Sequence, residues 1–218
     1  MHPIILSADS TCDLDTELKE RYQVQYFPFH IILDGNDYQD NVDITPNEIY
    51  QAYYDKKILP KTSAINVEEY RNHFLPWVQN GYEVLHINLG SSLSSAHQNC
   101  RLAAEELGHV HVIDSGNLST GTGLLVVAAG KMIQEGLPAE EIAQRLREHT
   151  KNCHASFILD TLTFMHAGGR CSSVAALGAN LLKLKPCIEV DNHDGSMHVG
   201  KKYRGTLENV LVKYTKDQ

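Results

Sequence analysis

The sequence predicts an α/β protein, with an N-terminal Rossmann-like parallel sheet flanked by helices and a smaller C-terminal α+β domain that looks truncated. As far as about Lys151, short apolar strand candidates alternate with helix candidates, which is the order of βαβ units in a parallel sheet. Beyond that point, Asp194-Gly195 lies between two apolar runs and indicates an antiparallel hairpin. We therefore expect two domains, residues 1–151 and residues 152–218.

The first part of the chain predicts two strands with a helix between them. Ile4–Leu6 is a short apolar run, and Val24–Leu33 alternates between apolar and polar residues, so each predicts a strand. The polar segment Asp9–Asp13 is expected to cap a helix over Leu14–Tyr22. Asp34–Asn36 has a glycine between two polar residues and predicts a turn after the second strand.

Two helices are expected to begin with capping boxes. Thr45 is followed by a proline and then by Glu48, so that the threonine and glutamate side chains can each bond to the other's backbone amide. Asn66 and Glu69 repeat this spacing before the next helix. Between the two helices, residues 59–64 form a loop that is rich in hydroxyl groups.

The remaining predicted strands and helices alternate in the parallel domain, and an antiparallel hairpin follows in the C-terminal domain. In the parallel domain, the expected strands and helices are Glu83–Leu89, Ala96–Leu107, His109–Ile113, Leu124–Gln134 and Ala139–His149 in chain order. In the C-terminal domain we expect a strand at Ser156–Leu159, a short helix broken at Gly168-Gly169, a helix over Ser173–Leu184, a hairpin of Cys187–Val190 with Met197–Val199, and a helix over Thr206–Tyr214.

Composition and charge argue against several classes of protein. The chain has 218 residues, of which 42% are hydrophobic and 21% charged, and its formal net charge is -8. Such an acidic surface disfavours nonspecific binding to nucleic acid or to anionic membranes. Five cysteines without a C-x-x-C pair favour reduced thiols over disulfides. Because no signal-peptide pattern or membrane-spanning apolar run is present, we expect a cytoplasmic protein without stable membrane insertion.

The segment Gly90–Ser95, called the serine loop below, separates a predicted strand from a predicted helix. In a parallel sheet such loops gather at the carboxyl ends of the strands, where ligands bind, and the helix N-terminus adds free amide groups. Its hydroxyl groups can therefore bind a carboxylate or a phosphate, although simple helix capping is the alternative. The nucleophile pattern G-x-S-x-G is absent, because Ser94 stands where its second glycine would be.

Three other features leave their alternatives open. The small-residue loop Ser119–Gly123 matches neither G-x-G-x-x-G nor a P-loop, so helix capping is favoured over a phosphate site. His109 and His111 share one face of a strand, but no third ligand is evident and no metal is assigned. Arg170 follows two glycines and suits either an anion or partner contact or a solvated helix end.

Seven segments, taken in order along the chain, carry a family resemblance. They are Ser7–Leu14, Asp40–Pro46, Pro60–Ser63, Gly90–Ser95, Val112–Ser115, Asp160–Leu162 with Gly168–Arg170, and Leu182–Pro186. Together they resemble motifs of the DegV family of bacterial fatty-acid-binding proteins, such as D-S-T-C-D-L at the start and D-x-L-x-x-L-x-x-G-G-R late in the chain. The weight of the resemblance lies in the shared order of the segments.

The resemblance implies a two-domain lipid carrier that holds a long-chain, palmitate-like fatty acid in a tunnel and presents its carboxylate to a fatty acid kinase. It implies no catalytic residue, metal or cofactor. By their position in the motifs, Thr62, Ser63, Ser91 and Ser94 are expected to hold the carboxylate, and Arg170 to lie near the surface that faces the kinase. The alternatives are a serine-dependent acyl hydrolase and a structural remnant that cannot close its pocket.

Overall fold

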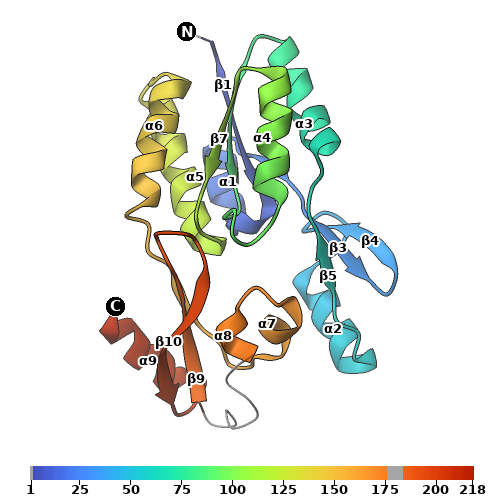
Figure 1. Ribbon diagram of the computed structural model, residues 1–218, viewed down its shortest axis with the longest axis vertical. Coiled ribbons are helices and arrows are strands. Elements are labelled where there is room, and N and C mark those ends of the chain that lie inside the picture. Colours follow the sequence, from blue (N-terminus) through green and yellow to red (C-terminus); the bar gives the residue numbers. More distant parts are fainter. Residues whose placement is uncertain (1, 176–183) are drawn as a thin grey trace.

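A computed structural model describes residues 2–175 and 184–218 of the protein, and a four-stranded parallel sheet lies between helices in the upper half of the view in Figure 1. Its strand order is β2-β1-β6-β7, and all three pairings are parallel. The predicted α/β class with a parallel sheet is thereby confirmed. The four strands are β1 (Ile4–Asp9), β2 (Gln25–Phe27), β6 (Glu83–Asn88) and β7 (Val110–Asp114).

Helices cover both faces of this sheet (Figure 1). One face carries α5 (Ser119–Gln134) and α6 (Ala139–Thr150), and the other carries α3 (Val67–Gln79) and α4 (Ala96–Leu107). Successive strand residues point to opposite faces, so Leu6 packs with Val126 and Ile142, whereas Val84 packs with Phe74 on the other side. No helix in the described parts of the chain combines the length and apolar character that a membrane crossing requires.

Both predicted capping boxes are present. The Glu48 carboxylate accepts the Thr45 amide at 2.8 Å, and the Glu69 carboxylate accepts the Asn66 amide at 2.7 Å. In return, the Thr45 and Asn66 side chains accept the amides of Glu48 and Glu69. These contacts satisfy amide groups that a helix start otherwise leaves unpaired, and they begin α2 (Pro46–Lys56) and α3.

The segment after β1 departs from the prediction. Asp9–Asp13 was expected to cap the next helix, but Ser10–Cys12 forms a short 3-10 helix, η1. The helix α1 (Thr16–Arg21) begins instead at Asp15, whose carboxylate accepts the Leu18 amide at 2.8 Å. The side chain of Asp9 is thus free for another role.

A second, three-stranded sheet was not predicted. Its central strand β3 (His30–Leu33) pairs antiparallel with β4 (Asn36–Gln39) and with β5 (Lys61–Ser63), and α2 packs against it. The single strand predicted over Val24–Leu33 is therefore wrong, because β2 and β3 belong to different sheets. Pro28 lies at the break, where its missing amide proton prevents a continuous ladder.

A third sheet lies in the C-terminal part of the chain. The strands β8 (Ser156–Ile158), β9 (Leu184–Val190) and β10 (Met197–Arg204) are antiparallel, which confirms the predicted hairpin. Around them lie α7 (Thr163–Gly168), α8 (Ser172–Ala175) and α9 (Leu207–Asp217). The helix predicted over Ser173–Leu184 falls largely on residues 176–183, outside the described residues, and Leu184 itself begins β9. The division into residues 1–151 and 152–218, which falls between α6 and β8, stays a prediction.

Candidate functional site

The central sheet has a switch point between β1 and β6. The chain leaves β1 toward β2 on one side and leaves β6 toward β7 on the other, so the connections diverge at the carboxyl ends of these two strands. Such divergence opens a crevice where ligands bind in doubly wound sheets. A cavity of about 560 Å³ lies here, called the switch-point cavity below. It is lined by Thr11, Asp13, Phe29, Ile31, Asp40, Thr62, Ala64, Leu89, Leu93, Ser94, Ser95, Leu118, Ser119, Arg170 and Met197.

This cavity combines an apolar wall with a set of hydroxyl groups. Ile31 comes from β3 and Phe29 directly precedes that strand, while Leu93 comes from the serine loop and Met197 from β10, and all four are buried. Hydroxyl groups from four separate segments line the same space. An apolar enclosure with a few polar groups is the usual character of a site for a small organic ligand. Here it suits a ligand with a long apolar part and one polar end.

The structure brings together three of the five residues singled out from the sequence. Thr62 on β5, Ser94 in the serine loop and Arg170 beyond α7 all line the switch-point cavity. Ser63 follows Thr62 on the strand, where neighbouring side chains point to opposite faces, and it does not line this cavity. Ser91 lines a different cavity. What each of the five does in binding stays a prediction.

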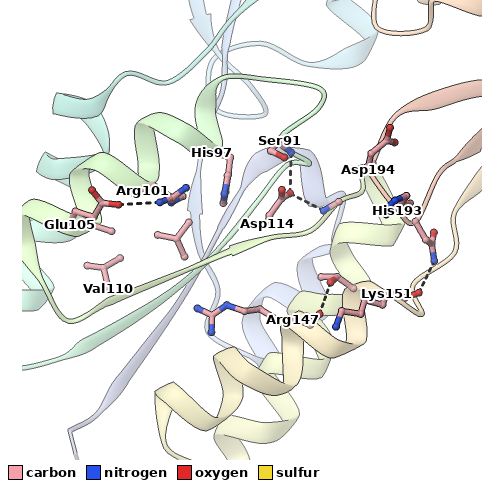
Figure 2. A pocket seen from close by; sticks show the side chains of 16 residues that line it. Ser91, His97, Arg101, Glu105, Val110, Asp114, Arg147, Lys151, His193 and Asp194 are labelled. Carbon is pink, nitrogen blue, oxygen red and sulfur yellow. Dashed lines mark hydrogen bonds and ion pairs between the residues drawn. The ribbon is translucent and has the colours of Figure 1, made fainter.

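The second cavity, called the β7 cavity, is larger, at about 790 Å³, and more polar (Figure 2). It lies along β7, between α4 and α6, and the turn of the β9–β10 hairpin closes one end. Charged side chains of both signs line it, including Arg101, Glu105, Asp114, Arg147 and Lys151. Most of these charged side chains are exposed to water, and a hydrocarbon chain laid over them would take them out of water at a cost, so this lining suits such a chain poorly.

The serine loop is held from both sides. The Gly90 amide donates to the Asn117 carbonyl at 2.8 Å, and the Ser91 amide donates to the Asp114 carboxylate at 3.0 Å. The Ser94 hydroxyl accepts the Ala96 amide at 3.2 Å, whereas Ser95, the N-cap residue of α4, makes no side-chain cap bond. A hydroxyl that accepts one hydrogen bond still has its proton to donate, and Ser94 therefore has a donor for a ligand.

A buried polar network that the sequence reading missed lies under the serine loop. Asp9 at the end of β1 is fully buried, and it accepts hydrogen bonds from the Tyr70 hydroxyl at 2.9 Å and the Asn88 amide at 3.2 Å. It also accepts the backbone amide of Leu89 at 2.8 Å and lies 3.2 Å from the His86 ring. Asp9 thus fixes the point at which the serine loop leaves β6.

The network continues through the core to α3. The Ser7 hydroxyl lies 2.8 Å from Nδ1 of His86 and 3.0 Å from Nε2 of His73. Burial, followed by the nearby His86, lowers the pKa of His73 to about 4. A signal for this network was present in the sequence, because polar residues at positions 7 and 9 and at 86 and 88 alternate within two apolar strands.

One carboxyl group of the switch-point cavity has a raised pKa. Burial raises the pKa of Asp40, and the nearby Asp13 adds to the effect, although hydrogen bonds from Ser10 and Asn41 oppose it. The Ser10 hydroxyl donates to Asp40 at 2.7 Å. Since Asp13 and Asp40 line the same cavity as Arg170, one part of the lining is acidic and another is basic.

Comparison with known proteins yields one consistent family. A family model described as "Uncharacterised protein, DegV family" matches residues 4–212. A DegV domain-containing protein from Clostridium acetobutylicum is 30% identical over the whole chain and 79% of its own length. A relative from Clostridium perfringens is 30% identical over 96% of the chain and 75% of its own length.

Solved structures agree with these sequence matches. A DegV family protein from Thermus thermophilus, described as binding fatty acid, superposes with a TM-score of 0.82 at 30% identity, covering 98% of this chain and 77% of its own. A stearic-acid-binding protein from Eubacterium ventriosum superposes with a TM-score of 0.83 at 28% identity, covering 100% and 76%. The fold described above is therefore shared over nearly the whole chain.

Proposed function

Because this chain belongs to the DegV family, we propose that it binds a long-chain fatty acid in the switch-point cavity. The observation that carries the proposal is the lining of that cavity. Apolar side chains from near each of the three sheets line it together with the hydroxyl groups of Thr62 and Ser94. The fatty-acid-binding proteins of the same fold from Thermus thermophilus and Eubacterium ventriosum support it.

The energetics favour recognition of the tail by burial and of the head by hydrogen bonds. A palmitate-like chain has about fourteen methylene groups, and at about 0.8 kcal/mol each their burial contributes roughly 11 kcal/mol before ordering costs. An unpaired buried carboxylate would be very costly, so the head group needs donors. We assign Thr62 and Ser94 to this task, whereas a role for Ser63 and Ser91, which do not line this cavity, stays a prediction from the sequence.

We further propose that the protein acts as a cytoplasmic carrier that presents the carboxylate to a fatty acid kinase. Arg170 is exposed and lines both the switch-point cavity and a neighbouring cavity beside α2 and α7, so it lies between the ligand and the outer surface. Arginine is well suited to such a contact, because its planar group binds carboxylates and phosphates through paired hydrogen bonds. The five cysteines are free and buried, in keeping with a reducing compartment.

A serine-dependent acyl hydrolase has less support. Ser7, His86 and Asp9 are joined by hydrogen bonds in the order of a catalytic triad. All three are fully buried, and none lines any of the cavities described above, so a substrate cannot reach the Ser7 hydroxyl. The same bonds instead explain how the strand ends β1 and β6 are held together.

Native mass spectrometry of the purified protein tests the central proposal. We expect a co-purifying acyl chain, or uptake of one after exposure to palmitate. A chain that stays free of lipid after that exposure would overturn the proposal. Covalent labelling of a serine by a fluorophosphonate probe would instead favour the hydrolase.

The kinase role has its own test. With a purified fatty acid kinase and ATP, we expect Arg170→Ala to retain palmitate binding and to lose most phosphorylation of the bound acid. Arg145→Ala, which removes an exposed arginine from α6, serves as the control. Equal phosphorylation of the wild type and Arg170→Ala would remove Arg170 from the proposed interface.

A further inference from the structure

Thr11 has a hydroxyl group without a partner. It belongs to η1, directly after β1, and it lines the switch-point cavity. Its Oγ1 atom is nevertheless buried and forms no hydrogen bond. A buried polar atom without a partner lowers stability, and most such atoms in native proteins are paired. An unpaired hydroxyl at the edge of a ligand cavity therefore needs an explanation.

The surrounding polar groups are already engaged with one another. The Ser10 hydroxyl donates to Asp40 and accepts the Phe29 amide at 3.2 Å. On the other side, the hydroxyl of Tyr26 accepts both the Cys12 thiol at 3.2 Å and the Leu14 amide at 3.0 Å. The two neighbours of Thr11, Ser10 and Cys12, thus each form side-chain hydrogen bonds with other residues, and the Thr11 hydroxyl takes part in neither group.

A rotation about the Cα–Cβ bond connects the buried hydroxyl with the cavity. Threonine has three staggered side-chain conformations about this bond, and a step of about 120° moves the hydroxyl to the place that the methyl group or the hydrogen atom held before. Because Thr11 already lines the cavity, such a rotation can bring Oγ1 to a ligand without a change in the backbone.

The lining beside Thr11 includes the carboxyl groups of Asp13 and Asp40, and a helix start supplies positive partial charge to the same cavity. Ser119 at the start of α5 lines the same cavity, and the first turn of this 16-residue helix has no side-chain cap. Free amides of a helix start carry a partial positive charge. Ser119 also has a φ of 50°, a conformation that is uncommon outside glycine and is often found at functional sites.

We propose that Thr11 is a further ligand-binding residue, whose hydroxyl donates a hydrogen bond to the carboxylate of the bound fatty acid. This inference rests on the proposed function, and it adds a residue that follows β1 to the Thr62 and Ser94 contacts. It has an unusual consequence for mutation. Removing the hydroxyl should weaken binding, yet it should not destabilise the ligand-free protein, because no hydrogen bond is lost on the protein side.

Thr11→Val tests this, since valine keeps the shape and removes the hydroxyl. We expect palmitate affinity, measured by calorimetry, to fall about tenfold, the effect of one hydrogen bond to a charged group. Thr11→Ser should stay within about twofold of the wild type, because serine keeps the donor. The melting temperature of ligand-free Thr11→Val should equal or exceed that of the wild type.

Thr122→Val is the matched control. Thr122 is a fully buried threonine in the first turn of α5, and its hydroxyl donates to Ser115 at 3.0 Å. We expect this variant to lose thermal stability and to keep its palmitate affinity. Hexadecanol, which has no carboxylate, should bind wild type and Thr11→Val with more similar affinities than palmitate does.

The outcomes separate the two proposals. If the wild type does not bind palmitate at all, the proposed function fails. If the wild type binds but Thr11→Val binds equally well, only the assignment of Thr11 fails. A loss of stability in ligand-free Thr11→Val as large as in Thr122→Val would also overturn it, because the hydroxyl would then have a partner within the protein.

Discussion

The two cavities beside the serine loop differ in a way that volume does not reveal. Ser94 and Ser95 line the switch-point cavity, whereas Ser91, only three residues before Ser94, lines the β7 cavity. The β7 cavity is larger, at about 790 Å³ against about 560 Å³, but six Asp, Glu, Lys and Arg side chains line it, against three in the switch-point cavity. The comparison teaches that the chemistry of the lining, and not its size, identifies the place for a hydrocarbon tail.

The largest effect is expected when both proposed head-group contacts are removed. Thr62→Ala combined with Ser94→Ala deletes two hydrogen bonds to a charged group, so we expect palmitate affinity to fall roughly 100-fold in calorimetry. Ser91→Ala changes a hydroxyl of the other cavity and should have a much smaller effect. If Ser91→Ala weakened palmitate binding as strongly as the double variant, the proposal that palmitate binds in the switch-point cavity and not in the β7 cavity would be wrong.

The polar network beneath the loop should make the protein sensitive to acid. Since the pKa of His73 is lowered to about 4, the unfolded state binds a proton more readily than the folded state between pH 6.5 and about 4. Stability is therefore lost as the pH falls through this window, by on the order of 2 kcal/mol. Urea unfolding at pH 7 and pH 4.5 measures this.

His73→Gln removes the titrating ring and should reduce this pH dependence. His149→Gln, which changes an exposed histidine on α6, provides the control and should leave the dependence as in the wild type. A pH profile that is identical in all three proteins would show that the acid sensitivity arises elsewhere.

The turn of the β9–β10 hairpin lines the β7 cavity and lies against the serine loop. Gly195 has a φ of +73°, and a Cβ atom there would lie 3.1 Å from both the Gly116 carbonyl oxygen and the Ser92 hydroxyl. We expect Gly195→Ala to cost about 1 to 2 kcal/mol of stability through backbone strain. It should also lower palmitate affinity severalfold, because the added methyl group displaces the serine loop.

Gly136→Ala separates strain from contact. Gly136 has a similar φ of +81°, but a Cβ atom there would meet nothing within 4 Å. Thermal unfolding should show a similar loss of stability in both variants, and only Gly195→Ala should bind palmitate less tightly. Equal affinities would mean that the hairpin turn does not position the loop.

The smallest effect is expected at the acidic end of the switch-point cavity. Because the pKa of Asp40 is raised in the folded protein, the stability linked to its protonation is present at low pH and is lost as the pH rises through the folded pKa. Asp40→Asn should thus slightly raise the melting temperature at pH 7, with the gain disappearing below about pH 3.8. It should also tighten palmitate binding slightly, since one negative charge is removed from the cavity.

Asp55→Asn makes the same change of charge at an exposed position on α2 and should alter neither property. A lower palmitate affinity in Asp40→Asn would show that the ionised Asp40 carboxylate assists binding. The expectation that its negative charge weakens palmitate binding would then be wrong.

Local signals in the sequence were enough for much of the fold. The capping boxes at Thr45 and Asn66 and the hairpin at Asp194-Gly195 each depend on residues within a few positions of one another, and all three were predicted correctly. The small sheet was missed because β3 pairs with β5 across about thirty residues of chain, and no local pattern records such a pairing. Pro28 was the available hint that Val24–Leu33 does not form one strand.

The sequence by itself determined the family, the alternation of strands and helices, and the presence of a hydroxyl-rich loop after β6. Only the tertiary structure decided that Ser94 faces the apolar cavity and Ser91 the charged one, that Asp9 lies buried beneath the loop, and that Thr11 has no partner. The reason is physical: the direction of a loop is set by hydrogen bonds to distant segments. Here the amides of Leu89 and Gly90 are held by Asp9 and Asn117, far away in the sequence and adjacent only in the folded chain.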